Sequence, residues 1–301
     1  MKKGLILVFA TAIISGFSIF INKYGVVGIN AYVFTFLKNI SVMLLLGGFI
    51  LLAKEWRSII KLTKTQWLRL VVIGFIGGGA AFLLFFKGLS ITSAAQGSFI
   101  HKTMFVYTMI LAVMFLKEKI KKEMLIGGFL LLAGNLLALK SFNISFGLGD
   151  FYVFLATILW ATENIISKYA LKDLSGPIVA WGRMFFGAVL IMIFLAISGQ
   201  LWIIGHLSLE QTLWIEITSL VLFGYVMTWY AGLKHIPVSL ATTILLIGSP
   251  VTTFLAFVSS GKINSGEIIS GSLIVVGLAF IFLFKKITKN QGQVVTDIDP
   301  L

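Results

Sequence analysis

The stretch GLILVFATAIISGFSIFINKY (4–24) recurs as GDFYVFLATILWATENIISKY (149–169), and this repetition decides the fold. The match continues beyond the quoted stretches: Lys38 aligns with Arg183, and Gly88-Leu89 aligns with Gly232-Leu233. Self-similarity over such a length indicates an internal duplication. We therefore predict two homologous repeats, residues 1–142 and 147–289, followed by a disordered tail at 290–301.

Both repeats consist mainly of long apolar runs, and the chain as a whole is 58% hydrophobic and only 12% charged. About 20 apolar residues are needed for a helix to cross a bilayer core of about 30 Å. Windows of that length predict an all-α membrane protein with ten transmembrane helices, five in each repeat. The predicted helices cover residues 4–22, 30–53, 67–87, 91–116, 123–140, 149–170, 176–198, 208–233, 238–260 and 265–284.

An odd number of helices per repeat means that the second repeat enters the membrane from the opposite side to the first. The two repeats are therefore predicted to be inverted, an arrangement in which transporters form their sites at the repeat interface. With the N-terminus inside, the inner segments hold most of the 24 lysines and arginines, and the outer segments hold only Lys23, Lys87, Lys140 and Lys262. The positive-inside rule then predicts that both termini and the 290–301 tail are cytoplasmic, in a multi-pass protein of the cell membrane. The net charge of +13 follows this topology, so it gives no reason to expect a nucleic-acid partner.

Five ionisable side chains lie well inside apolar runs: Lys38, His101, Lys102, Glu163 and Arg183. A charge at mid-helix costs about 2.5 to 3.5 kcal/mol on insertion scales, so such residues usually face a cavity or a partner. They are the first candidates for a site that binds substrate or protons.

Glu163 and Arg183 are predicted to lie at matched depth on consecutive helices, where they could form an ion pair. One interpretation is a permanent salt bridge that clamps the two helices. The other is a pair that opens when a substrate or a proton arrives. His101 is a second candidate for proton coupling, although a histidine in a helix is often only a packing residue.

Lys102 is predicted at the middle of its helix, with no carboxylate at a comparable depth in the first repeat. Together Lys38, Lys102 and Arg183 outnumber the single embedded carboxylate, Glu163, so a cavity lined by them would be positively charged. This favours an anionic or zwitterionic substrate. The alternative for Lys38 and Arg183 is that each side chain reaches the nearer membrane surface.

Aromatic and amide side chains on the same helices could form the wall of a site. The candidates are Tyr107, Trp160, Asn164, Trp229 and Tyr230, with Phe85-Phe86 as the repeat counterpart of Trp229-Tyr230. Aromatic residues near helix ends are otherwise interfacial anchors. Pro250 predicts a break in the helix at 238–260, and because its counterpart is Val106, we expect that break to have no equivalent in the first repeat.

Several function classes lack their residues. The chain has no cysteine, which excludes thiolate zinc sites and thiol catalysis. No phosphate-binding loop of a primary pump is present. The three histidines, at 101, 206 and 235, lie on separate segments and do not form the paired ligands of a metal-dependent hydrolase. We expect neither a metal nor another cofactor, and no enzymatic activity.

The order of these features resembles the EamA-type branch of the drug/metabolite transporter superfamily over nearly the whole chain. The resemblance rests on the two five-helix repeats, Lys38 and Arg183 early in the second helix of each, the Gly-Leu pairs, FLKEKI (115–120) and SPVTTFLAFVSSGKI (249–263). The sequence departs from the family at Val106, where proline is common, and at Gly261-Lys262, where Gly-Glu is common.

The resemblance implies a secondary transporter, commonly an exporter of amino acids or other small metabolites, that works by alternating access through a central cavity between the repeats. Its expected partners are the lipid bilayer, a small organic solute and, if transport is coupled, protons. The alternative is a lipid scramblase or a membrane sensor that transports nothing, because inverted repeats alone do not prove solute transport.

Overall fold

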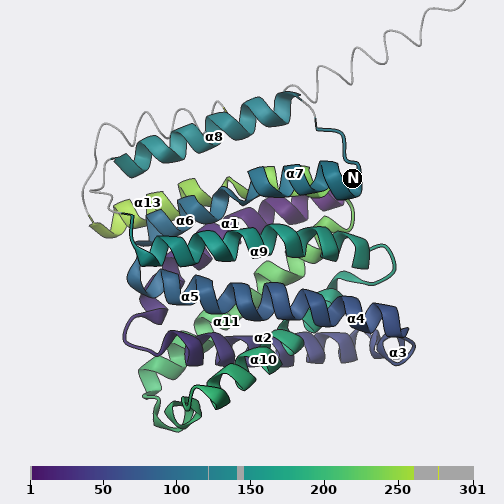
Figure 1. The fold of residues 1–301 in the computed structure, drawn as a ribbon, viewed down its shortest axis with the longest axis vertical. Coiled ribbons are helices and arrows are strands. Elements are labelled where there is room, and N and C mark those ends of the chain that lie inside the picture. The colour runs from purple at the N-terminus through teal and green to yellow at the C-terminus, as the bar shows by residue number, and fades with distance from the viewer. Residues whose placement is uncertain (1, 121, 141–145, 261–276, 278–301) are drawn as a thin grey trace, which may run out of the picture.

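The computed structural model describes residues 2–120, 122–140, 146–260 and 277, and every element in this part of the chain is helical, as predicted (Figure 1). The first repeat comprises α1 (Lys2–Val26), α2 (Ala31–Leu52), α3 (Trp56–Ile60), α4 (Lys64–Ile73), the π-helix η1 (Gly74–Ala80), α5 (Ala81–Ile91), α6 (Ala94–Lys102), α7 (Met104–Leu116) and α8 (Lys122–Lys140). The second comprises α9 (Leu148–Ala170), α10 (Gly176–Ile197), the 3-10 helix η2 (Leu201–His206), α11 (Leu209–Leu233), α12 (Val238–Leu245) and α13 (Gly248–Ser260).

Seven helical segments among these residues are long and apolar enough to cross a membrane. They are Lys2–Val26, Ala31–Leu52, Lys64–Ile91, Ala94–Leu116, Gly176–Ile197, Leu209–Leu233 and Val238–Ser259. Helix α9 has 23 residues but carries Asp150, Glu163 and Lys168, and it is not among the seven. In α8 the apolar part, Met124–Gly134, is shorter. The predicted tenth helix, 265–284, and the tail at 290–301 lie outside the described residues.

Local capping signals explain where several helices begin. The Asn30 side chain accepts hydrogen bonds from the amides of Tyr32 and Val33, and so starts α2. Thr63 and Ser208 each form a reciprocal capping box with the glutamine three residues later, at the starts of α4 and α11. Such caps satisfy amides that have no partner within the helix.

Helices of one repeat pack against helices of the other. Helix α1 packs against α11 and α13, α9 packs against α5 and α7, and α10 packs against α2 and η1. Close approach requires glycine at some of these crossings: a Cβ on Gly88 would lie 2.6 Å from the carbonyl oxygen of Gly149. The two repeats therefore share one core.

The equivalent first helices of the two repeats run in opposite directions. Asp150, at the start of α9, accepts a hydrogen bond from Thr92, and the carbonyl of Thr92 accepts one from Lys23 near the end of α1. At the other end of the bundle, a Cβ on Gly4 near the start of α1 would lie 2.8 Å from Cβ of His235, which follows α11. Antiparallel first helices are what an odd number of helices per repeat predicts.

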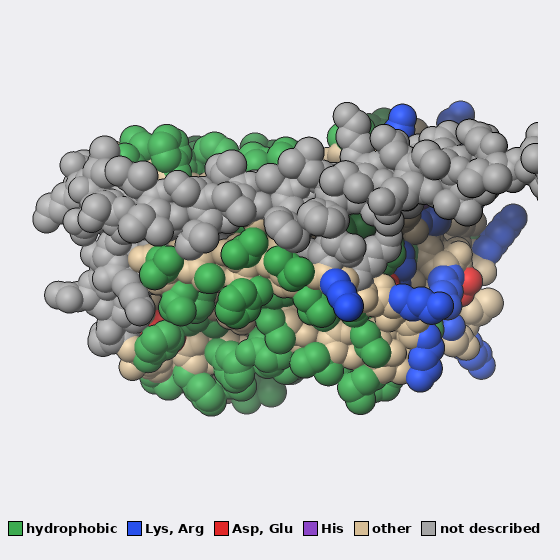
Figure 2. All heavy atoms as spheres, turned by 90° about the horizontal axis from the view of Figure 1, so that it is seen from above, with side chains coloured by type: hydrophobic (Ala, Val, Ile, Leu, Met, Phe, Trp, Pro, Cys, Tyr) green, Lys and Arg blue, Asp and Glu red, His purple; other side chains and the backbone are tan. Residues whose placement is uncertain are grey.

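One end of the bundle is strongly basic. Figure 2 shows lysine and arginine side chains gathered at one end of the bundle, the end at which Figure 1 places both α3 and the start of α1. The connection from α2 to α4 supplies Lys54, Arg57, Lys61 and Lys64. We call this end of the bundle the basic end. The other end, at which α1 finishes, is called the opposite end.

Between the two ends, the described part of the face shown in Figure 2 carries many hydrophobic side chains. Leu44 is 63% exposed, Phe129 71% and Ile110 54%, on three different helices. An apolar surface of this extent is unfavourable in water and favourable against lipid tails. The fold is therefore that of a multi-pass membrane protein.

Candidate functional site

A cavity of about 60 Å³ lies among helices of both repeats. This volume holds a few water molecules. Its polar and charged lining residues are Ser15, Ser18, Asn22, Lys38, His101, Glu163, Asn164 and Arg183. Its apolar and aromatic lining residues are Ile19, Phe82, Phe85, Phe86, Met104, Trp160, Leu222, Tyr225 and Trp229. The structure thus brings together most of the predicted site residues.

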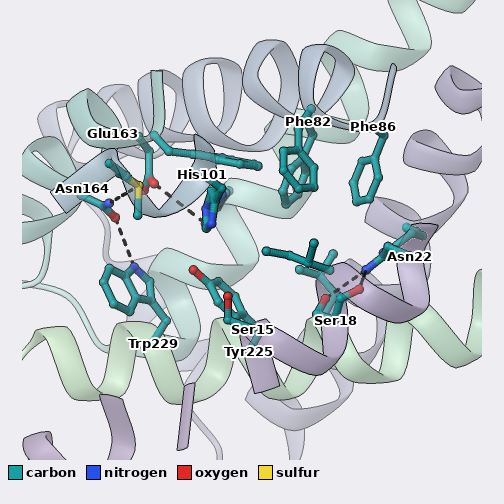
Figure 3. Close-up of a pocket in the computed structure, with 17 residues that line it drawn as sticks. Ser15, Ser18, Asn22, Phe82, Phe86, His101, Glu163, Asn164, Tyr225 and Trp229 are labelled. Carbon is teal, nitrogen blue, oxygen red and sulfur yellow. Dashed lines mark hydrogen bonds and ion pairs between the residues drawn. The ribbon is translucent and has the colours of Figure 1, made fainter. Parts of the chain in front are cut away.

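The two ends of the cavity differ in chemistry (Figure 3). Glu163, Asn164 and Trp229 lie toward one end, and Phe86, Asn22 and Ser18 lie toward the other. Lys38 belongs to the second group, because its ammonium donates a hydrogen bond to the side-chain oxygen of Asn22. The cavity therefore has a charged group near each end.

Glu163 and Arg183 form the predicted ion pair, with Arg183 Nη1 3.8 Å from Glu163 Oε2. The Tyr230 hydroxyl accepts a hydrogen bond from Arg183 Nη1 at 3.1 Å and donates one to Glu163 Oε1 at 2.7 Å. The Ser167 hydroxyl also donates to Glu163 Oε1 from one turn along α9. Tyr230 thus fixes the geometry of a pair that is buried inside the bundle, where Glu163 and Arg183 both line the cavity.

Three buried polar atoms around the cavity have no hydrogen-bond partner among the described residues. They are Oε2 of Glu163, Nε of Arg183 and Nδ1 of His101. A buried polar group without a partner costs about 1 to 3 kcal/mol, more when it is charged. These atoms are therefore the positions at which a water molecule or a solute group would be stabilised.

The π-helix η1 contacts both members of the Glu163–Arg183 pair. The Ala81 amide bonds to the carbonyl of Ile76 rather than to that of Gly77. The Gly77 carbonyl accepts hydrogen bonds from Trp160 Nε1 at 2.9 Å and Arg183 Nη2 at 3.2 Å. A Cβ on Gly77 would lie 2.5 Å from Cγ of Glu163, so only glycine fits here. π-helical turns often occur at functional sites.

Aromatic rings pack around Trp160 in one wall of the cavity. Its ring centroid is 5.0 Å from that of Phe85, 5.4 Å from that of Phe82 and 5.1 Å from that of His101. The guanidinium of Arg183 lies 5.0 Å from the Phe82 ring centroid, within the range of a cation–π interaction. The predicted counterpart wall also forms: Trp229 Nε1 donates to Asn164 Oδ1 at 3.2 Å, and Tyr225 stacks on Trp229.

The two buried lysines have neutral partners. Lys38 lies 4.6 Å from the ring centroid of Phe86 in addition to its bond to Asn22. Lys102 donates to the Ser15 hydroxyl at 2.7 Å and is only 2% exposed. In the part of the chain that the structure describes, neither ammonium lies within ion-pair distance of a carboxylate. Lys102 does not line the cavity itself. It lies directly behind Ser15, which does line the cavity.

Tyr107 and Pro250 lie away from the cavity lining. Tyr107 packs edge-on against Phe154 and lines a separate surface pocket with Phe99 and Phe151. Pro250 is the third residue of α13, and the helix is interrupted just before it, between Leu245 and Gly248. No three His, Asp or Glu side chains among the described residues gather into a group that could hold a metal ion.

The expectation that the break near Pro250 has no counterpart is wrong. The first repeat is interrupted at Thr103, between α6 and α7, where Thr103 and Val106 make short i to i−3 hydrogen bonds. Leu246 and Ile247 make the same kind of bond between α12 and α13. A proline is therefore not needed for the break.

Sequence reasoning missed the polar face of α1. Ser15, Ser18 and Asn22 all line the cavity, and their spacing of three and four residues places them on one face of a helix. Polar residues at helical spacing inside an apolar run are the signal that could have found them. Tyr225, Met104 and Phe82 carried no comparable signal.

Comparison with known proteins identifies the family. The EamA-like transporter family matches residues 2–140 and 147–283, one copy in each repeat. An uncharacterised transporter of Bacillus subtilis, YyaM, is 25% identical over 238 residues, which is 74% of this chain and 77% of the relative. An uncharacterised transporter of Clostridium kluyveri is 23% identical over 270 residues, covering 85% of this chain and 84% of the relative.

A solved crystal structure shares the fold, with a TM-score of 0.76 at 15% identity over 94% of this chain and 98% of that one. The two family matches agree with the duplication read from the sequence, and the apolar helices agree with a transporter of the cell membrane that acts on a small molecule. The chain belongs to the EamA-like transporter family.

Proposed function

We propose that this protein is a secondary transporter that exports a small anionic or zwitterionic metabolite through the cavity between its two repeats. The observation that carries the proposal is the cavity itself. It is lined by helices of both repeats, has charged groups near both ends and has buried polar atoms without a hydrogen-bond partner among the described residues. Sites of this kind at the interface of inverted repeats serve alternating access.

The charge around the cavity supports the substrate class. Lys38 and Arg183 line it together with one carboxylate, Glu163, and Lys102 adds a further cation behind Ser15. Among the described residues Lys38 has only neutral partners, so a solute carboxylate beside it would be stabilised by the ammonium. At the other end, Oε2 of Glu163 is ion-paired with Arg183 but has no hydrogen-bond partner among the described residues, and it could accept a hydrogen bond from a solute ammonium.

We also propose roles in gating or proton coupling for Glu163 and His101, and the same geometry supports them. Glu163 accepts hydrogen bonds from Tyr230 and Ser167 through one oxygen. The other oxygen faces Arg183 at 3.8 Å, has no hydrogen-bond partner among the described residues and could take up a proton. Protonation would weaken the attraction to Arg183 and free the guanidinium for a solute anion. His101 lies beside Trp160, its Nδ1 has no hydrogen-bond partner in the described part of the chain, and it could pass a proton along the cavity.

For the topology we propose ten spans, with the basic end and both termini in the cytoplasm. The support is the concentration of lysine and arginine at the end where α1 begins. The interruptions at Thr103 and at Leu246–Ile247 are places where the spans of both repeats could bend during the transport cycle.

The test is flux of labelled amino acids, organic acids and nucleotide sugars into proteoliposomes, with and without an imposed pH gradient. Saturable flux that follows the gradient is the expected result, and flux indifferent to the gradient would remove the proton-coupling roles of Glu163 and His101. Movement of lipid between leaflets without any solute flux would instead favour a scramblase and contradict the proposal.

A further inference from the structure

Two lysines at equivalent positions of the repeats each bind the connection of a helical hairpin. Lys23 Nζ donates to the carbonyls of Leu89, Ser90 and Thr92, at 3.1, 3.4 and 2.6 Å, between α5 and α6. Lys168 Nζ donates to the carbonyls of Leu233 and Ile236, at 2.6 and 2.7 Å, between α11 and α12. The repeat alignment pairs Lys23 with Lys168, Leu89 with Leu233 and Thr92 with Ile236. This set of hydrogen bonds from one lysine to the carbonyls of a hairpin connection, which we call a clasp, is therefore present in both repeats.

The two clasps lie at opposite ends of the bundle. Lys23 is near the end of α1. Lys168 binds the chain just after α11, and this part of the chain lies against Gly4 at the start of α1. At 1.5 Å per residue, Gly4 and Lys23 are about 30 Å apart along the helix. One clasp is thus at the basic end and the other at the opposite end.

Each hairpin is also held by a carboxylate from the other repeat. Asp150, at the start of α9, accepts from the Thr92 hydroxyl at 2.6 Å. Glu118, after α7 in the FLKEKI motif, accepts from the amides of Val238 and Ser239, at 2.8 and 3.0 Å, and from the Ser239 hydroxyl. A lysine of its own repeat and a carboxylate of the other thus tie each hairpin to the rest of the bundle.

The clasped hairpins carry the cavity walls. Helices α5 and α6 contribute Phe82, Phe85 and His101, and α11 contributes Tyr225 and Trp229. A movement of either hairpin away from its clasp would open the cavity at that end. Lys23, Lys168 and Glu118 are only partly buried, so water could replace their hydrogen bonds once the hairpin has moved. The fully buried Glu163–Arg183 pair has no such replacement from bulk water.

We propose that Lys168 with Glu118 is the latch of the basic end and Lys23 with Asp150 is the latch of the opposite end. They are positioning residues that set which end of the cavity is closed, and transport requires one latch to release while the other holds. This inference rests on the proposed alternating-access function.

The absence of cysteine makes the test clean, because a single introduced cysteine reports without background. Ser18→Cys places the reporter on the cavity wall, and a membrane-impermeant maleimide is applied from either side of oriented vesicles. Lys168→Met is expected to raise the labelling rate from the basic end about tenfold and to lower it from the other, as a population shift requires. Lys23→Met is expected to do the reverse.

Matched variants separate a latch from a general structural role. Lys61→Met removes an exposed lysine from the basic end and is expected to change neither rate. Lys168→Arg and Lys23→Arg keep hydrogen-bond donors and are expected to give the wild-type ratio of labelling rates. If a methionine variant does not fold, Glu118→Gln and Asp150→Asn give the same comparison, with Glu118→Gln opening the basic end.

Equal changes of the labelling rate from both sides, or none in any of these variants, would overturn the latch. The labelling needs no transported solute, so this outcome is distinct from a failure of the flux assay. A protein whose cavity opens alternately but carries none of the tested solutes would keep the latch and lose the substrate proposal.

Discussion

Glu163 and Arg183 are buried together and share the Tyr230 hydroxyl, whereas Arg69 and Asp173 form an exposed pair at 2.8 Å. Removing one partner of a buried pair leaves an uncompensated charge and costs about 3 to 5 kcal/mol. An exposed pair contributes about 0 to 1 kcal/mol. We therefore predict that Glu163→Gln markedly lowers the thermal stability of the purified protein in detergent, while Asp173→Asn hardly changes it.

The double variant Glu163→Met with Arg183→Met distinguishes a clamp from a working pair. Because it removes both charges, its stability is expected to recover toward that of the wild type, whereas its transport activity is expected to be lost. Full transport by the double variant would show that the pair is only structural.

Lys102 provides a second prediction about a single side chain. It supports Ser15 at the cavity wall and has no carboxylate partner among the described residues. We expect Lys102→Ala to reduce solute flux by at least about tenfold, or about 1.4 kcal/mol, without loss of expression. The exposed Lys61→Ala serves as the control, and unchanged flux in Lys102→Ala would remove the residue from the site.

Embedded charges were predictable from the sequence because hydrocarbon excludes them, and the structure gathers Lys38, His101, Glu163 and Arg183 around one cavity. Tyr107 was less predictable, since an aromatic side chain suits a site, a core or a membrane interface equally well. The position of Lys102 behind Ser15 depends on the crossing of α1 and α6, which no single helix specifies.

The π-helix η1 is the element on which the Glu163–Arg183 pair rests, and glycine is required there by contact rather than by propensity. A Cβ on Gly77 would lie 2.5 Å from Cγ of Glu163, whereas a Cβ on Gly48 in α2 would meet no atom within 4 Å. Overpacking costs about 1 to 3 kcal/mol, and alanine in an open helical position is favoured over glycine by about 0.5 to 1 kcal/mol.

We accordingly predict that Gly77→Ala lowers the melting temperature and the transport rate, and that Gly48→Ala leaves both unchanged or raises the melting temperature slightly. Melting followed by tryptophan fluorescence in one detergent compares the two. Equal effects of both substitutions would contradict the contact argument.

The positions of the described helices followed well from apolar windows, because length and hydrophobicity are properties of a segment alone. The π-helical turn and the interruption at Thr103 did not, because neither has a proline to mark it. Both depend on packing between repeats: η1 lies against α10, and the interruption follows α6, which packs against α9 and α13.

The duplication extends to the whole molecule, since the first helices of the two repeats run in opposite directions and helices of one repeat pack against helices of the other. The proposed topology puts the basic end in the cytoplasm. Ser58 in α3 is exposed at that end, and Val27 just after α1 is exposed at the other. We predict that Ser58→Cys reacts with an impermeant maleimide only from the cytoplasmic side and Val27→Cys only from outside. The opposite pattern would invert the topology.

The central claim is that the cavity between the repeats is the path of the solute, and blocking it tests that claim most directly. In the Ser18→Cys variant, flux of a transported solute is measured before and after complete modification by a bulky maleimide, with the cysteine-free parent as control. We predict that modification abolishes flux in Ser18→Cys and leaves the parent unaffected. Undiminished flux through the fully modified variant would contradict the claim.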